Sequence, residues 1–256
     1  MEKRILKEKD LKKFRDFLMD DEKSVSTLDK YMRDLRRFVA VLEEKAIDKQ
    51  KVLTYKNDLK KSYAVTSANS MLASINSFLR FMGWHDLCVK QFKVQKNAYS
   101  PEEKELTKSE YRALVKAASD KKDERLSLVI QTICSTGIRV SELQYVTVEA
   151  VKKGEAVVSC KGKTRRIFFV SELRKKLLSY INEKRVIKGC VFVTKTGKAI
   201  NRSNVWREMK SLCADAGFLS SKVFPHNLRH LFARTFYSVE KDIAKLADIL
   251  GRFEKA

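Results

Sequence analysis

Residues 136–143 have the sequence Thr-Gly-Ile-Arg-Val-Ser-Glu-Leu, and residues 225–230 have the sequence Pro-His-Asn-Leu-Arg-His. In the second stretch, His226 and Arg229 are three residues apart, so they share one face if the stretch is helical, and a leading proline suits a first helical turn. Two of the chain's three histidines fall within this short stretch. We therefore treat the two stretches as parts of one candidate site, to which the first contributes Arg139.

Arginines in this arrangement suit chemistry at a phosphate. A phosphodiester can be cleaved without a metal ion if positive donors hold its non-bridging oxygens while charge develops on them. Arginine suits this task, because its planar fork donates hydrogen bonds in pairs and keeps its charge. Arg139 and Arg229 are therefore candidate clamps for one phosphate. Glu142 follows Arg139 by three residues and could hold its guanidinium, although helix solubility explains a glutamate here equally well.

The two stretches resemble the active-site signature of the tyrosine recombinases, the family of phage and conjugative-transposon integrases. The first matches the family's first arginine box almost residue for residue, and the second matches its His-x-x-Arg box. The resemblance implies that Arg139 and Arg229 clamp one DNA phosphate, and that His226 transfers a proton or contacts that phosphate. It implies a structural role for His230. The family's mechanism uses a later tyrosine to form a 3′-phosphotyrosyl bond, and it needs no metal and no cofactor.

A basic hairpin is predicted in the middle of the chain. Two β-prone runs, residues 156–160 and 167–170, flank the sequence Lys-Gly-Lys-Thr-Arg-Arg at residues 161–166. This tip resembles the family's β-turn, whose lysine protonates the leaving 5′ oxygen. Lys163 is our candidate because it begins the family's Lys-x-Arg element, and Lys161 remains an alternative. A basic hairpin that only touches backbone phosphates would show the same pattern. The other basic residues of the tip are expected to bind DNA: Lys161, Arg165 and Arg166.

The end of the sequence departs from the family's pattern. Residues 248–251, Asp-Ile-Leu-Gly, resemble the approach to the family's second histidine box, which continues with a histidine and, later, the nucleophilic tyrosine. Here Arg252 follows the glycine and the sequence ends at Ala256. Tyr237 is a poor substitute, since it lies on the predicted helix of Arg229 in a segment expected to be core. We expect a catalytic domain truncated before its nucleophile, which binds DNA and clamps phosphate without cutting.

The N-terminal part of the chain is predicted to be a helical bundle. Residues 8–83 have apolar positions at three- and four-residue spacing, with lysine and arginine on the other faces, and predict four helices. We expect residues 1–86 to form the family's core-binding, SAM-like DNA-binding domain. The candidate caps are Ser26 or Thr27 for the second helix, Asp48 for the third and Thr66 or Ser67 for the fourth, with Gly83 as its end.

A second domain is expected at residues 107–256, after a linker at residues 87–106. Thr107-Lys108-Ser109-Glu110 has the spacing of a capping box and predicts that a helix begins there. The fold class is therefore mainly α with a small β-sheet: an N-terminal helical bundle followed by an α+β tyrosine-recombinase catalytic domain. Beyond the hairpin, helices are predicted at residues 171–187, 201–216, 226–237 and 240–250, with a further strand at 191–194.

Charge predicts a polyanionic partner. The 256 residues include 54 Lys and Arg against 32 Asp and Glu, a formal net charge of +22. Such an imbalance opposes compaction unless an anion relieves it. We expect double-stranded DNA at recombination sites as the partner, held in a basic clamp that the family's two domains form. The resemblance also implies that protomers can associate on that DNA.

The remaining composition argues against metal sites and membranes. The five cysteines show no Cys-x-x-Cys spacing and few histidines lie nearby, so no metal is expected. No run approaches the roughly 18 apolar residues of a membrane span, and the N-terminus has no apolar run of signal-peptide length. We expect a cytoplasmic protein with no membrane partner.

Three functions remain open from the sequence. The first is a site-specific recombinase or integrase that breaks and rejoins DNA, here in truncated form. The second is a non-cutting accessory protein that occupies recombination sites. The third is a basic RNA- or DNA-binding module with a fortuitous motif, which would be favoured if Arg139 and Arg229 pointed apart.

Overall fold

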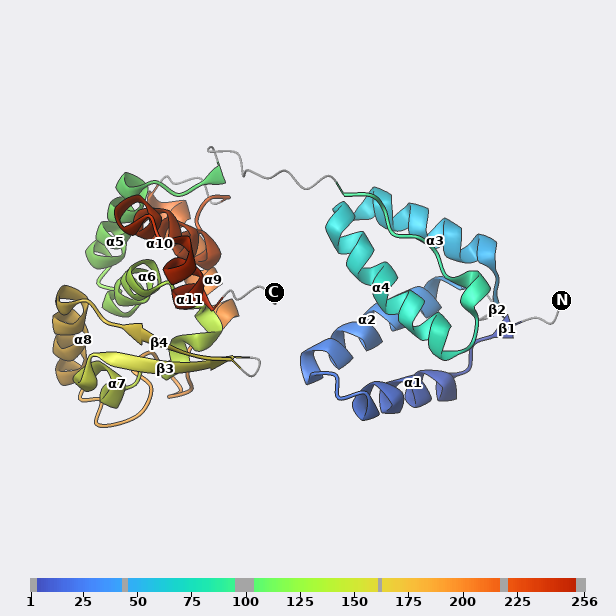
Figure 1. Ribbon diagram of the computed structural model, residues 1–256, viewed down its shortest axis with the longest axis horizontal. Coiled ribbons are helices and arrows are strands. Elements are labelled where there is room, and N and C mark those ends of the chain that lie inside the picture. Colours follow the sequence, from blue (N-terminus) through green and yellow to red (C-terminus); the bar gives the residue numbers. More distant parts are fainter. Residues whose placement is uncertain (1–3, 43–45, 95–103, 161–162, 217–220, 252–256) are drawn as a thin grey trace. The chain divides into compact units, whose positions relative to one another are not determined.

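The computed structural model describes residues 4–42, 46–94, 104–160, 163–216 and 221–251. These residues are mostly helical, with two small antiparallel sheets, and the chain divides into two compact units, Met1–Ala98 and Tyr99–Ala256 (Figure 1). The predicted fold class, mainly helical with a small sheet, is confirmed.

In the described part of the first unit, four α-helices surround a core that includes Phe14, Phe38 and Phe78, all fully buried. The ring of Phe14 meets that of Phe78 edge-on, with centroids 5.3 Å apart. A short antiparallel ribbon, β1 (Arg4–Ile5) with β2 (Ala46–Ile47), ties the start of the described chain to the segment before the third helix. The helices are α1 (Glu8–Asp20), α2 (Val25–Val41), α3 (Lys49–Ser62) and α4 (Val65–Phe81).

The helix starts of this unit differ in part from the prediction. Asp48 caps α3 as predicted, because its side chain accepts from the Lys51 amide. In α2 the cap is Ser24, whose hydroxyl accepts from the Thr27 amide, so both predicted caps lie inside the first turn. α4 also begins earlier than predicted, after Ala64, and has no side-chain cap.

The chain after α4 packs on the first unit, although we placed its residues in the linker. A short 3-10 turn, η2 (His85–Leu87), follows α4. The Asn76 amide then donates to the Val89 carbonyl and its oxygen accepts from the Val89 amide, and Asn69 holds Phe92 in the same way. Side-chain amides on α4 thus hold this backbone, and apolar periodicity does not reveal such contacts.

The second unit surrounds α6, which packs against α5, α8, α9 and α10. Its middle residues Val129, Ile130 and Ile133 are fully buried. The predicted capping box at Thr107 is present at the start of α5. The helices are α5 (Lys108–Asp120), α6 (Glu124–Thr136), the 3-10 helix η4 (Val140–Tyr145), α7 (Val148–Lys153), α8 (Ser171–Glu183), α9 (Arg202–Ala216), α10 (Pro225–Glu240) and α11 (Ile243–Leu250).

The hairpin pairs β3 (Glu155–Cys160) with β4 (Lys163–Phe168), from Glu155 opposite Phe168 to Cys160 opposite Lys163. The predicted tip at residues 161–166 is therefore wrong in extent, because residues 163–166 belong to β4. Strand side chains alternate between faces, so Arg165 shares a face with buried Ile167, whereas Arg166 points the other way.

Other bounds in this unit were also mispredicted. Residues 191–194 form no strand but only an isolated bridge between Val193 and Ala199. α8 ends at Glu183, short of the predicted 187, whereas α10 extends beyond 237 to Glu240. α11 begins at Ile243 rather than at 240, after a left-handed residue at Lys241 ends α10.

Candidate functional site

The first box turns sharply at Gly137, where α6 ends. Gly137 has φ +63°, and a Cβ built there would lie 2.5 Å from the Phe232 ring, so both the backbone and the space favour glycine. Arg139 lies two residues later and is the N-cap of η4, which begins at Val140. The end of one helix and the start of the next therefore fix the position of Arg139.

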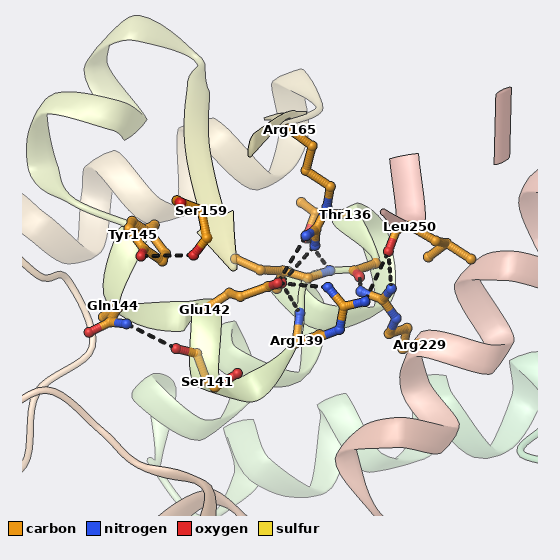
Figure 2. Close-up of polar contacts among 12 residues, drawn as sticks. Thr136, Arg139, Ser141, Glu142, Gln144, Tyr145, Ser159, Arg165, Arg229 and Leu250 are labelled. Carbon is orange, nitrogen blue, oxygen red and sulfur yellow. Dashed lines mark hydrogen bonds and ion pairs between the residues drawn. The ribbon is translucent and has the colours of Figure 1, made fainter. Parts of the chain in front are cut away.

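Glu142 lies buried beside Arg139 and holds two arginines (Figure 2). Its Oε1 accepts from Arg139 Nη1 at 2.8 Å, and its Oε2 from the Arg139 amide at 2.7 Å. Arg165 Nη1 and Nη2 donate to the same carboxylate, at 2.9 and 2.6 Å. Burial disfavours the charged carboxylate, but the hydrogen bonds from Arg165 and Arg139 outweigh it and lower the pKa of Glu142 to about 2.

Arg229, on α10, is buried against the same group (Figure 2). Its Nη1 donates to the Gly137 carbonyl, and its Nη2 donates to the Leu250 carbonyl at 2.5 Å. Arg139 Nη2 donates to the Leu250 carbonyl as well, at 3.3 Å. The two arginines therefore converge on one acceptor and do not point apart.

Both arginines line a cavity of about 440 Å³ together with His226. The ring of His230 lies edge-on to that of His226, with centroids 4.5 Å apart, one turn further along α10. Three arginines in the wall, Arg139, Arg202 and Arg229, give the cavity a cationic character that suits an anionic group. The wall is completed by Ile138, Val140, Ser141, Trp206, Phe224 and Pro225.

The chain matches the profiles of two protein families. The profile of the phage integrase family matches residues 104–253, and that of the phage integrase N-terminal SAM-like domain matches residues 11–85. The chain belongs to the phage integrase family of tyrosine recombinases.

Curated relatives of this family align with nearly the whole chain. Tyrosine recombinase XerA of Pyrococcus furiosus is 26% identical over 98% of this chain and 88% of its own length. Tyrosine recombinase XerC of Lacticaseibacillus casei is 26% identical over 93% of this chain and 88% of its own length. A lambda integrase dimer bound to a COC′ core site shares the fold with a TM-score of 0.78 at 18% identity, covering 97% of this chain and 74% of that one.

The predicted basic residues of the hairpin have different environments in this recombinase. Arg165 was expected to contact DNA; its side chain is nearly buried and its fork binds Glu142, so the DNA contact stays a prediction. Arg166 is exposed and lies 3.4 Å from the Glu155 carboxylate. Lys163 begins β4, although its side chain lies outside the described residues, as does Lys161.

Two residues of α9 in the cavity wall were not anticipated from the sequence. Arg202 and Trp206 line the cavity, and Trp206 is 51% exposed, with the Lys210 ammonium 5.6 Å from the centre of its ring. An exposed aromatic among basic residues on one helix is the signal that could have found them.

Tyr237 lies on α10 but does not line the cavity that contains the arginines. Its side chain is exposed, and the neighbouring Phe232 and Phe236 are half-buried rather than core, which corrects our interpretation of that segment. Among the described residues there is no cluster of His, Cys, Asp and Glu that could hold a metal ion. Within the same residues, no helix is long and apolar enough to span a membrane.

Proposed function

We propose that this chain is a site-specific DNA recombinase or integrase whose second unit clamps one phosphate of duplex DNA with Arg139 and Arg229. The observation that carries the proposal is their shared position: they come from separate boxes, bind one carbonyl and line one cavity. The guanidinium fork matches the non-bridging oxygens of a phosphodiester, where charge develops during cleavage.

His226 and Lys163 complete the proposed chemistry. His226 lines the cavity on the face of α10 that carries Arg229, so it reaches the same phosphate as a hydrogen-bond donor or proton carrier. Lys163 begins β4 and is our candidate for the acid that protonates the leaving 5′ oxygen, with Lys161 as the alternative. Arg166, exposed on β4, contacts the DNA backbone.

Double-stranded DNA at a recombination site is the proposed partner. The net charge of +22 favours a polyanion, and several solved relatives are described as bound to DNA, among them the lambda integrase dimer on its core site and a lambda integrase tetramer on a Holliday junction. We extend this to association of protomers of this chain on DNA, in the cytoplasm and without a cofactor.

A polypeptide of these 256 residues contains no tyrosine after Tyr237, and Arg252 follows Gly251. We propose that this polypeptide binds and clamps DNA but does not cut it. The reaction needs a hydroxyl that attacks phosphorus, forms a phosphotyrosyl ester and releases the 5′ hydroxyl. Tyr237 lies outside the cavity wall and does not supply it. An accessory role, in which the protein occupies recombination sites without cutting, is the second candidate, and it is favoured by Arg252 at the position where the family's pattern has a histidine.

A nicked suicide substrate carrying the recombination site separates the two candidates. The 256-residue polypeptide should bind the substrate and trap no covalent adduct. A polypeptide extended with a histidine in place of Arg252 and a downstream tyrosine should trap one, because the clamp already prepares the phosphate. The matched control carries the same extension with phenylalanine for that tyrosine. An extended polypeptide that binds but forms no adduct favours the accessory role, and an adduct mapped to Tyr237 in the unextended chain contradicts our assignment.

A further inference from the structure

The last turn of α11 presents an unusual acceptor to the site. The final carbonyls of a helix have no partner within it, and here the Leu250 carbonyl accepts from both Arg139 Nη2 and Arg229 Nη2. Gly251 follows in the left-handed region at φ +60°, and its amide turns back to the Ala247 and Asp248 carbonyls. The helix therefore ends at the arginine pair, with its last carbonyl between them.

Arg229 lies between the ends of two helices. Its Nη1 binds the Gly137 carbonyl, where α6 ends, and its Nη2 binds the Leu250 carbonyl, where α11 ends (Figure 2). The C-terminus of a helix carries partial negative charge. A guanidinium that is only 4% exposed needs such compensation, because an isolated buried charge is costly. The two helix ends thus both hold and orient Arg229.

The absence of a side chain at Gly251 leaves room for Arg165. A Cβ built on Gly251 would lie 3.3 Å from Arg165 Cδ and 3.4 Å from its Nη1. Arg165 binds Glu142, and Glu142 binds Arg139. A side chain at position 251 would therefore strain the backbone and also press on the ion-paired group that orients Arg139.

We propose that the turn Leu250–Gly251 is a positioning element for the phosphate clamp. The Leu250 carbonyl holds the two guanidinium groups side by side, and Gly251 gives α11 the left-handed end that brings this carbonyl to them. A displacement of α11 removes this shared contact from both arginines together, and leaves Arg139 held only by Glu142 and Arg229 only by the Gly137 carbonyl among the contacts described above. The inference rests on the proposed function only in naming phosphate as what the arginines bind.

Arginine NMR tests the geometry in the wild-type protein without DNA. Protein labelled with 15N-arginine and with 13C at leucine carbonyls should show slowly rotating, resolved Nη signals for Arg139 and Arg229, assigned with Arg139→Lys and Arg229→Lys. Both signals should couple through the hydrogen bond to the Leu250 carbonyl. Rapidly averaged Nη signals, or no coupling to a leucine carbonyl, overturn the proposal even if every variant below fails to fold.

Gly251→Ala tests the consequence, with Gly197→Ala as the matched control. Gly197 lies in the same unit at φ +76°, and a Cβ built there would have nothing within 4 Å. The Gly197→Ala variant therefore introduces the backbone strain without a contact such as that with Arg165. Gly251→Ala should average the Nη signals of both arginines, and Gly197→Ala should leave them unchanged.

Binding of a 20-base-pair duplex, followed by fluorescence anisotropy across a salt series, gives the functional readout. Gly251→Ala should make the slope of log K against log salt shallower by about 0.9 per lost phosphate contact, as Arg139→Ala does, and should add no further change in the Arg139→Ala, Arg229→Ala background. A wild-type slope in Gly251→Ala, or full additivity in that background, overturns the proposal. Failure of the wild-type protein to bind duplex contradicts the proposed function instead and leaves the NMR result standing.

Discussion

Glu142 and Arg165, 23 residues apart in the sequence, form a two-pronged ion pair with Nη–Oε distances of 2.9 and 2.6 Å. Their side chains are 2% and 9% exposed. The pair joins η4, which begins after Arg139, to strand β4 of the hairpin. The Tyr145 hydroxyl also donates a hydrogen bond to the Ser159 carbonyl, which is a further contact between η4 and the hairpin (Figure 2). The arginine box and the hairpin strands are thus joined through a buried carboxylate.

Glu142→Ala should destabilise the protein strongly. Removing one partner of a buried ion pair leaves an uncompensated charge, which costs about 3–5 kcal/mol. Here Arg165 would lose both of its Nη contacts to the carboxylate, and Arg139 would lose its side-chain support. Urea unfolding measures the loss. Glu172→Ala is the control, because that side chain is 82% exposed and pairs only with surface Lys176 in the part of the chain described. A Glu142→Ala loss no larger than the control's contradicts the buried pair.

The same carboxylate should give the protein an acid-sensitive component of stability. The pKa of Glu142 is lowered in the folded state from an ordinary 4.5 to about 2, so the folded protein binds fewer protons than the unfolded one between these values. The contribution is therefore complete above pH 4.5 and is lost as the pH falls towards 2. It amounts to on the order of 3 kcal/mol, at about 1.4 kcal/mol per pKa unit. The stability difference between wild type and Glu142→Gln should shrink over this window, and a difference that stays constant with pH contradicts the assignment.

The site could be predicted only in part from the sequence. The reason why a residue was or was not predicted differs from residue to residue. Arg139, His226 and Arg229 stand out because short contiguous boxes carry their side-chain chemistry. The contact of Arg165 with Glu142 was not anticipated, because the direction of its side chain depends on strand register: β4 begins at Lys163, so Arg165 lies within the strand, on the face of buried Ile167. The Leu250 carbonyl gives no sequence signal at all, since every residue has one.

The fold shows the same division between local and long-range determinants. The Thr107 capping box is a contact between residues three apart, and the prediction is confirmed. The packing of residues 87–93 depends on Asn69 and Asn76, whose amides meet backbone groups 13 to 23 residues later. The mispredicted strand at 191–194 has β-prone residues but only one bridge partner, and a strand needs a neighbour as well as a propensity.

Lysine should not replace either clamp arginine. Arg229 uses two nitrogens to reach carbonyls on two different helices, and a single ammonium cannot occupy both positions. Arg229→Lys and Arg139→Lys should therefore lose protection of the clamped phosphate in a DNA footprint nearly as fully as the alanine variants. Arg166→Lys is the control, since an exposed backbone contact needs only charge. Wild-type footprints in both clamp variants would show that the fork is not what binds the phosphate.

The affinity of the whole chain for duplex DNA should fall steeply with salt. Each phosphate neutralised by lysine or arginine releases counterions and contributes about −0.9 to the slope of log K against log salt. With a net charge of +22 and basic residues in both units, we expect many such contacts, measured by anisotropy on one duplex over a range of salt. Arg139→Ala should weaken binding and make the slope shallower by about one contact, whereas Gly197→Ala should change neither. A wild-type slope shallower than about −3 means that fewer than about four phosphates are neutralised, too few for both units to hold the same duplex.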